Sequence, residues 1–299
     1  MSSISTLRPE ITAPQPTSVS CPLCGADEPR TLYRSERPFM RIVRCRPCGM
    51  MYQSPRVAEA EMEDAYQSLE EYGHYESLED SKRKLFESRI RRFQRQWGLR
   101  EEGAFLDVGA SRGVMLDAVR ALLPQWRVAG VEISPSARAA LLARGYAALP
   151  SIEALDAAAK FDWINLDNVL EHMPDPGAIL GRLKTHLNPG GFIYIDVPNE
   201  SFFSFRYRIN DLARGFRKPP TFPGHVNLFT PRTLKRLFSA AECRCERFWL
   251  ESVSAPYRLS AVGATATGRT KTILDLLRAT RLDIGLRAAY FLCAKIQSV

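Results

Sequence analysis

The chain has 299 residues, of which 45% are apolar and 25% charged, and its formal net charge at pH 7 is +8. This composition is close to the globular average and excludes an intrinsically disordered, collagen-like or coiled-coil protein. The longest uninterrupted apolar run, residues 288–294, is too short to cross a bilayer, and the basic excess permits an acidic partner without naming one.

The first twenty residues are rich in Pro, Ser and Thr and lack the apolar segment of a secretory signal. We therefore expect residues 1–20 to form a disordered leader and the protein to be cytoplasmic. Seven cysteines, an odd number in a chain with no export signal, do not indicate a disulfide framework.

Four of the cysteines form two C-x2-C pairs, Cys21-Pro-Leu-Cys24 and Cys45-Arg-Pro-Cys48, separated by 20 residues. Two such pairs can place four thiolates around one ion in tetrahedral geometry, which predicts a structural zinc in a module spanning residues 21–58. Two redox pairs are the alternative, but no βαβ context surrounds them. The other cysteines are expected to be ordinary buried or half-buried thiols: Cys243, Cys245 and Cys293.

The next segment, residues 59–97, is rich in Glu, Arg and Tyr and predicts mostly helix with a break at Gly73. A run of charges on a helix normally faces solvent. We therefore expect a solvated face formed by Lys82, Arg83, Lys84, Arg89, Arg91, Arg92 and Arg95.

From residue 104 onward, strand and helix patterns alternate, which predicts an α/β fold with a mostly parallel sheet covered on both faces. Ligands of such sheets bind outside the carboxyl ends of the strands. Ser134-Pro135 and Thr230-Pro231 are typical helix starts, and residues 188–191 predict a turn. The expected strands are 104–108, 127–133, 161–168, 192–197, 243–250 and 288–296, and the expected helices include 114–123, 175–187 and 230–241.

A small-residue loop, Asp107-Val-Gly109-Ala-Ser111-Arg-Gly113, joins the first of these strands to a helix. A dinucleotide fingerprint would need glycine at positions 111 and 114, which are Ser and Val. The same loop matches the nucleophile elbow G-x-S-x-G of serine hydrolases, with Asp196 and His225 following in order. That alternative is weak because the loop follows the first strand and no oxyanion loop precedes it.

A third interpretation also uses two acids, Asp107 and Glu132, which end adjacent strands. Small residues let the backbone approach a ligand, Asp107 can reach an ammonium group, and Glu132 can accept hydrogen bonds from ribose hydroxyls. A nucleoside with a cationic amino-acid tail fits this set of residues, and S-adenosylmethionine is such a ligand.

At this point the sequence resembles the class I S-adenosylmethionine-dependent methyltransferases, in the branch with an N-terminal zinc-binding module. The loop is similar to the family motif D-x-G-x-G-x-G, with Ser111 in place of the middle glycine. Three further segments resemble family motifs: Phe161-Asp-Trp-Ile-Asn-Leu-Asp-Asn168-Val-Leu-Glu171-His172-Met-Pro-Asp-Pro176, Leu187-Asn-Pro-Gly-Gly191-Phe-Ile-Tyr-Ile-Asp-Val-Pro198-Asn199 and His225-Val-Asn-Leu-Phe229.

The resemblance implies a Rossmann-like, seven-stranded sheet whose last strand is antiparallel, within a methyltransferase domain spanning residues 59–299. It also implies the residues that contact the cofactor: Asp107, Gly109, Ala110, Ser111, Gly113, Glu132, Ile133, Asn168 and Val169. In similar enzymes, tyrosines ahead of the sheet cover the cofactor, and Tyr72 and Tyr75 are candidates here.

A methyl acceptor that is a hydroxyl or an acidic carbon must lose a proton to a base. His172 and His225 are the candidate catalytic bases, with a positioning role as the alternative. Glu171 and His172 could instead ligate a divalent ion, as in some O-methyltransferases that the chain resembles. The two remaining histidines, His74 and His186, are expected at the surface.

Aromatic and Arg side chains are mixed in residues 200–224, which predicts a lid over a small acceptor that is partly apolar and partly anionic. A sugar, a lipid precursor or a secondary metabolite would fit, methylated at oxygen or carbon. A helical insertion, 252–287, includes an amphipathic stretch that favours core packing, with contact to a membrane surface as the alternative. An RNA methyltransferase or a zinc-ribbon nucleic-acid protein is the competing class, disfavoured because the basic residues are scattered.

Overall fold

The computed structural model describes residues 16–34, 41–56, 79–201, 224–252 and 290–298 of the chain. Several sequence predictions therefore fall outside the described residues. These are most of the leader, the tyrosines Tyr72 and Tyr75, nearly all of the lid segment and the helical insertion. Within the described residues, no helix is long and apolar enough to span a membrane.

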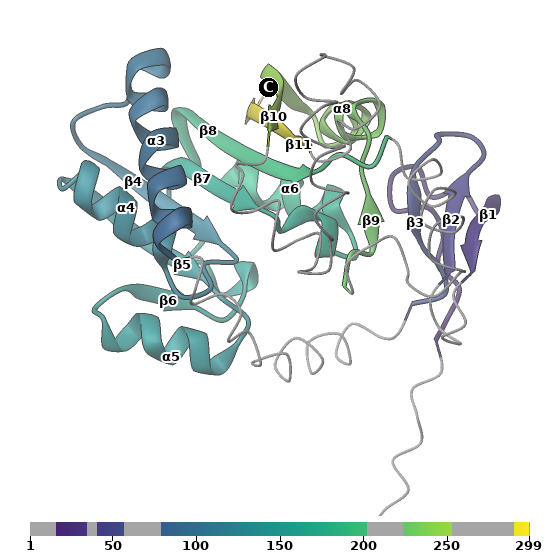
Figure 1. Ribbon diagram of the computed structural model, residues 1–299, viewed down its shortest axis with the longest axis horizontal. Helices are drawn as coiled ribbons and strands as arrows, with labels where there is room; N and C mark the ends of the chain where they lie inside the picture. The colour runs from purple at the N-terminus through teal and green to yellow at the C-terminus, as the bar shows by residue number, and fades with distance from the viewer. Residues whose placement is uncertain (1–15, 35–40, 57–78, 202–223, 253–289, 299) are drawn as a thin grey trace, which may run out of the picture.

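The core of the fold is a seven-stranded sheet of strand order β10-β11-β8-β7-β4-β5-β6 (Figure 1). Strands β4 to β8 pair in parallel, and β11 is antiparallel to both of its neighbours, β8 and β10. The implied seven strands and antiparallel last strand are therefore confirmed. The strands are β4 (Gly103–Val108), β5 (Trp126–Val131), β6 (Ala147–Leu149), β7 (Phe161–Asp167), β8 (Leu187–Pro198), β10 (Cys243–Ser252) and β11 (Tyr290–Ser298).

Two details of this sheet differ from the sequence expectation. Strand β6 was not among the expected strands, because three residues are too few to show a period. The expected turn at residues 188–191 lies within β8 as an irregularity, where Leu187 pairs with Phe161 and Phe192 pairs with Trp163. Gly190, with φ +79°, allows the backbone to bulge there.

Helices cover both faces of the sheet, as expected. On one face, α3 (Glu79–Trp97), α4 (Val114–Leu122) and α5 (Pro135–Ala143) enclose a core rich in aromatic rings. On the other face, α6 (Pro176–Thr185) and α8 (Pro231–Ala240) pack over a core of Leu, Ile and Val side chains. Both predicted helix starts are confirmed, since the Ser134 and Thr230 hydroxyls accept hydrogen bonds from the first helical turn.

A second, four-stranded antiparallel sheet holds the cysteine pairs. Three strands come from the expected module, β1 (Pro29–Arg34), β2 (Arg41–Cys45) and β3 (Met51–Gln53). The fourth, β9 (Asn227–Leu228), comes from the far end of the methyltransferase region and pairs with β3 (Figure 1). Cys21, Cys45 and Cys48 belong to the same hydrophobic cluster as side chains of α6 and α8, so the two sheets share one core.

Candidate active site

The small-residue loop after β4 is seated on the end of β5. Gly109 and Ala110 each donate a backbone hydrogen bond to the Val131 carbonyl, at 2.8 and 3.0 Å. Gly109 has φ +75°, and a Cβ there would lie 2.7 Å from Cγ2 of Val169. Ser111 (φ +48°) and Gly113 (φ +82°) continue the left-handed conformation. The loop therefore brings bare backbone close to whatever binds at this edge.

Glu132 holds this loop in place. Its carboxylate accepts hydrogen bonds from the backbone N–H groups of Ser111 at 2.6 Å and Ser134 at 2.8 Å. A carboxylate offers about four lone-pair sites, so two remain for a ligand's hydroxyls. The next side chain, Ile133, is 37% exposed beside it. The contact of Glu132 with a ligand stays a prediction, and the structure shows that its carboxylate links the loop to the start of α5.

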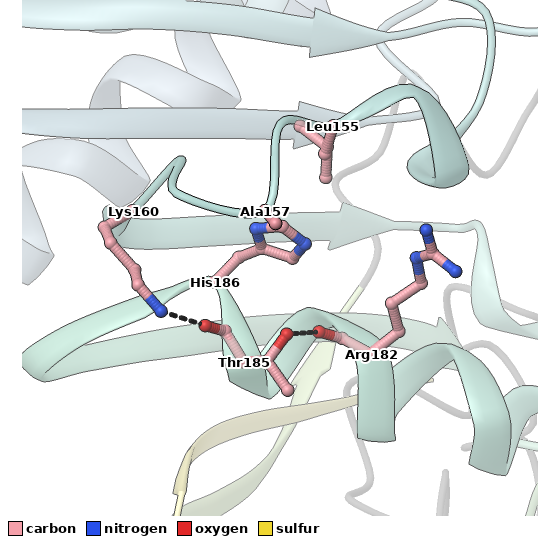
Figure 2. Close-up of a pocket in the computed structure, with 6 residues that line it drawn as sticks. All are labelled: Leu155, Ala157, Lys160, Arg182, Thr185 and His186. Atoms are coloured by element: carbon pink, nitrogen blue, oxygen red, sulfur yellow. Dashed lines mark hydrogen bonds between the residues drawn. The ribbon is translucent and has the colours of Figure 1, made fainter.

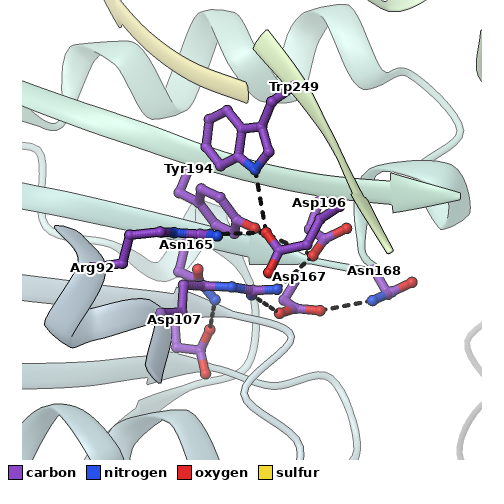
Figure 3. Close-up of polar contacts among 10 residues, drawn as sticks. Arg92, Asp107, Asn165, Asp167, Asn168, Tyr194, Asp196 and Trp249 are labelled. Carbon is purple, nitrogen blue, oxygen red and sulfur yellow. Dashed lines mark hydrogen bonds and ion pairs between the residues drawn. The ribbon is translucent and has the colours of Figure 1, made fainter. Parts of the chain in front are cut away.

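Asp107 lies beneath the loop and is 4% exposed. Its carboxyl accepts a hydrogen bond from the Asn165 side-chain amide of β7 at 2.8 Å (Figure 3). Burial raises the pKa of Asp107 to about 7, against the opposing effect of the Asn165 hydrogen bond. With a pKa near 7, this carboxyl can lose its proton when a cationic ligand binds beside it.

Asn168 and Val169 follow β7 and meet the loop from the neighbouring strand. Asn168 adopts φ +56°, its backbone N–H donates to the Asp196 carbonyl, and its side chain donates to Asp167 at 2.7 Å (Figure 3). Val169 lies against Gly109. All nine predicted cofactor residues thus gather at the carboxyl ends of β4, β5 and β7.

A buried ion-pair network under this edge was not foreseen. Arg89 of α3, 3% exposed, donates to Asp167 and, at 2.7 Å, to Asp196, and its guanidinium lies 4.8 Å from the Tyr194 ring centroid. Asp167, Tyr194 and Asp196 lie together in Figure 3. Burial lowers the pKa of Arg89, but Tyr194 and the two carboxylates outweigh it and hold that pKa well above its ordinary value.

The expected solvated face is therefore wrong for Arg89, although Arg83, Lys84, Arg91 and Arg95 are exposed as expected. The one available signal was helical spacing. Arg89 falls on the same face as Phe86 and Phe93, where an apolar side chain would be expected.

Both predicted base candidates meet around one buried acid. The His172 and His225 rings lie 4.8 Å apart, centroid to centroid, and each Nε2 lies 3.9 Å from Oε1 of Glu171. Glu171 is 1% exposed, and neither carboxyl oxygen has a hydrogen-bond partner among the described residues. Burial raises the pKa of Glu171 well above its ordinary value.

The electrostatics of the two rings favour their neutral form. Burial lowers the pKa of His172, and burial together with the neighbouring His172 lowers the pKa of His225 to about 3. The His172 Nδ1 lies 3.0 Å from the Gly224 carbonyl. Because a carbonyl can only accept, Nδ1 carries the hydrogen of the neutral ring, and the acceptor lone pair of the ring lies on Nε2.

The same cluster presents three ligand atoms, one each from Glu171, His172 and His225, within 4.8 Å of one another. This donor set also suits a divalent ion.

The four cysteines of the small sheet converge as predicted. All four Sγ atoms lie within 4.8 Å of one another, with Cys21 to Cys48 at 3.4 Å and Cys24 to Cys45 at 3.5 Å. A tetrahedral zinc with Zn–S bonds of about 2.3 Å places neighbouring sulfurs about 3.8 Å apart, so the cluster fits the ion.

The residues of the alternative hydrolase triad do not assemble. The Asp196 carboxylate accepts from Arg89, and His225 faces Glu171 and His172. Ser111 is exposed, and its contact here is a hydrogen bond from its backbone N–H to the Glu132 carboxylate. The elbow match is therefore a coincidence of sequence.

A separate surface pocket of about 270 Å³ opens at the opposite edge of the sheet, where β7 begins and α6 ends (Figure 2). Its basic groups already have partners in the protein. Lys160 donates to the Thr185 carbonyl at the end of α6, and His186 Nδ1 lies 2.9 Å from the Ala159 carbonyl. His186, expected at the surface, is 4% exposed. This pocket lies away from the glycine loop and plays no part in the site.

Comparison with known proteins agrees with this geometry. A family model described as "Methyltransferase domain" matches residues 78–247, more than half of the chain. The chain belongs to this methyltransferase family. The methyltransferase part of the resemblance is thereby confirmed, whereas the zinc-module branch rests on the cysteine cluster alone.

Curated relatives are similar over part of their length. The ubiquinone biosynthesis O-methyltransferase of Albidiferax ferrireducens is 33% identical over 127 residues, covering 37% of this chain and 50% of the relative. The trans-aconitate 2-methyltransferase of Azoarcus sp. is 32% identical over 107 residues, covering 33% and 41%. The chain thus spans about half the length, or less, of these relatives.

Solved structures share the fold at low identity. The 1,6-didemethyltoxoflavin-N1-methyltransferase of Burkholderia thailandensis, solved with S-adenosylhomocysteine, has a TM-score of 0.51 and 17% identity, covering 91% of this chain and 99% of that one. The plantazolicin methyltransferase BpumL, also with S-adenosylhomocysteine, has a TM-score of 0.50 and 15% identity, covering 80% and 94%. These likenesses support the methyltransferase fold.

Proposed function

We propose that this protein transfers a methyl group from S-adenosylmethionine to a hydroxyl or acidic carbon of a small-molecule acceptor, at the carboxyl ends of β4, β5 and β7. The observation that carries the proposal is the convergence of the glycine loop, two strand-end acids and a neutral histidine pair at one edge of a methyltransferase sheet. The small-molecule methyltransferases among the relatives favour such an acceptor over RNA.

The residues around the loop fit the donor. The bare backbone at Gly109 leaves room for close approach, Glu132 has lone pairs left for ribose hydroxyls, and the exposed Ile133 offers an apolar surface for a base. Asp107 lies where it can compensate the positive tail, directly or through a water. When bound, S-adenosylmethionine supplies an already activated methyl group, so the protein's main task is to align the acceptor.

The histidine pair supplies the base. Neutral His172 carries its hydrogen on Nδ1 and can accept the acceptor's proton at Nε2. His225 is also neutral, and positive charge that develops on either ring faces the Glu171 carboxyl at 3.9 Å. Removal of a well-placed base slows a proton-transfer step by roughly 10²–10⁴-fold.

The test combines a labelled methyl donor, a panel of hydroxylated aromatic and carboxylic acceptors, and the variants His172→Gln and His225→Gln. We expect both variants to keep the affinity for S-adenosylhomocysteine and at least one to lose transfer. Full transfer rates in both would refute the base assignment, and failure of the wild-type protein to bind S-adenosylhomocysteine would refute the proposed function. Loss of wild-type transfer on chelation, restored by Mn²⁺ or Fe²⁺, would instead favour a divalent ion at Glu171.

We further propose that the four cysteines hold one structural zinc. Four protein thiolates leave no open coordination position, so the ion would stabilise the small sheet and take no part in methyl transfer.

A further inference from the structure

The sheet that carries the cysteines continues into the acceptor side of the site. Strand β9 begins two residues after His225, and its residues Asn227 and Leu228 pair with Tyr52 and Met51 of β3. The Gln53 N–H donates to the Val226 carbonyl at 2.9 Å. Thus the segment that bears His225 leads into the edge strand of the cysteine module's sheet.

The same segment is bonded to the segment that bears Glu171 and His172. The Val226 N–H donates to the Glu171 carbonyl at 3.0 Å, and the Asn227 side chain donates to the Met173 carbonyl at 2.6 Å. His172 Nδ1 in turn donates to Gly224 at 3.0 Å. These bonds set the distance between the two histidine rings.

Arg56, which follows β3, joins all of these segments. Its guanidinium donates to the Pro174 carbonyl at 3.0 Å, the Asn227 side-chain oxygen at 3.3 Å and the Val226 carbonyl at 3.5 Å, while its Nε donates to Gln53 at 3.0 Å. Arg56 is 6% exposed, and none of these acceptors is a carboxylate. Burying a guanidinium against neutral oxygens is costly, so a simple packing role does not account for it.

Charge in the cysteine cluster would offset part of this cost. Burial lowers the pKa of Arg56, and the Tyr52 hydroxyl and the Cys21 thiol act in the opposite direction. Four thiolates around one Zn²⁺ carry a net charge of −2, which is the sign that a buried guanidinium requires.

From these contacts we propose that Arg56 is a positioning residue, which couples the cysteine module to the acceptor site by holding the His225 segment against Glu171 and His172. This inference rests on the proposed function for its catalytic meaning. The glycine loop is held by Val131 and Glu132, which belong to β5 and its end. The coupling should therefore reach the acceptor side and leave donor binding unchanged.

The variant Arg56→Met removes all four hydrogen bonds and keeps an unbranched side chain of similar length. The matched control is Arg236→Met. Arg236 of α8 also bridges to the module, because it donates to the Cys48 carbonyl at 2.8 Å, but this bond touches neither histidine segment. The protein has only four histidines, so their ring Cε1–H resonances can be assigned from single His→Gln variants.

We expect Arg56→Met to move the His172 and His225 resonances while the dissociation constant for S-adenosylhomocysteine stays within about twofold of wild type. Arg236→Met should leave both resonances in place. Once an acceptor is known, kcat should fall by up to about 100-fold in Arg56→Met with an unchanged donor KM, because a misplacement of about 1 Å can cost that much.

Unmoved histidine resonances in Arg56→Met would overturn the proposal, as would equal shifts in both Arg variants. Should Arg56→Met fail to fold, Asn227→Ser removes the bonds to Arg56 and Met173 and must move the same two resonances. Histidine shifts in Arg56→Met together with normal transfer by His172→Gln and His225→Gln would refute the proposed base and leave the coupling established.

Discussion

Replacement of Arg89 by Met tests the buried ion-pair network beneath the site. Arg89→Met keeps much of the aliphatic packing and removes the charge that compensates Asp167 and Asp196. Asp196 is 2% exposed, so water cannot replace the guanidinium there. Breaking a buried pair and leaving its partner charged costs about 3–5 kcal/mol, out of a typical total of 5–15 kcal/mol.

The assay is urea unfolding followed by tryptophan fluorescence, since Trp163 and Trp249 both lie in the adjacent aromatic core. The control is Arg95→Met, the same change at an exposed position of α3, which should stay within about 0.5 kcal/mol of wild type. Adding Asp196→Asn to Arg89→Met should restore part of the loss, because one uncompensated charge is removed.

The loss of folding stability in Arg89→Met should depend on pH. Burial already raises the folded-state pKa of Asp196, and Arg89 opposes that rise. Without Arg89 this pKa lies further above its unfolded value, so the folded variant binds more protons than the unfolded chain and loses stability as pH rises. The difference from wild type should be larger at pH 8 than at pH 5. A loss below about 1 kcal/mol at pH 8, or one that grows on acidification, would show that the network does not carry the stability assigned to it.

Three further predictions concern the donor loop and the cysteines. Gly109→Ala places a Cβ 2.7 Å from the Val169 side chain, at a backbone φ of +75° that alanine rarely adopts. Calorimetry should show at least a tenfold loss of affinity for S-adenosylhomocysteine. The control Gly181→Ala, where a Cβ meets nothing within 4 Å, should bind S-adenosylhomocysteine normally. Asp107, with its pKa near 7, is mostly protonated at pH 6, so S-adenosylmethionine binding should release up to one proton there and none at pH 8.5. Asp107→Asn should abolish that release, and buffer-independent binding enthalpies in wild type at pH 6 would contradict the assignment. Cys45→Ser should lower zinc content from one per chain and destabilise the fold; metal analysis showing no zinc in wild-type protein would reject the site.

The sequence by itself determined the features whose geometry is local. The two C-x2-C pairs, the glycine loop and the helix starts at Ser134 and Thr230 are set by backbone sterics over a few residues, and the structure has them where the patterns placed them. The alternation of strands and helices likewise determined the fold class. These features can be predicted from the sequence because they involve residues that are close along the chain and therefore close in space.

Tertiary structure alone decided which distant surfaces meet. Helical spacing placed Arg89 on the apolar face of its helix, but no local pattern indicated that its partners would be Asp167 and Asp196. Nor did any pattern indicate that β9 would complete the sheet of β3. The convergence of both histidines on Glu171 likewise depends on pairing between segments more than fifty residues apart. Burial and charge compensation depend on how the whole chain packs. The sequence therefore shows which charged and polar groups are present, and only the tertiary structure shows which of them interact.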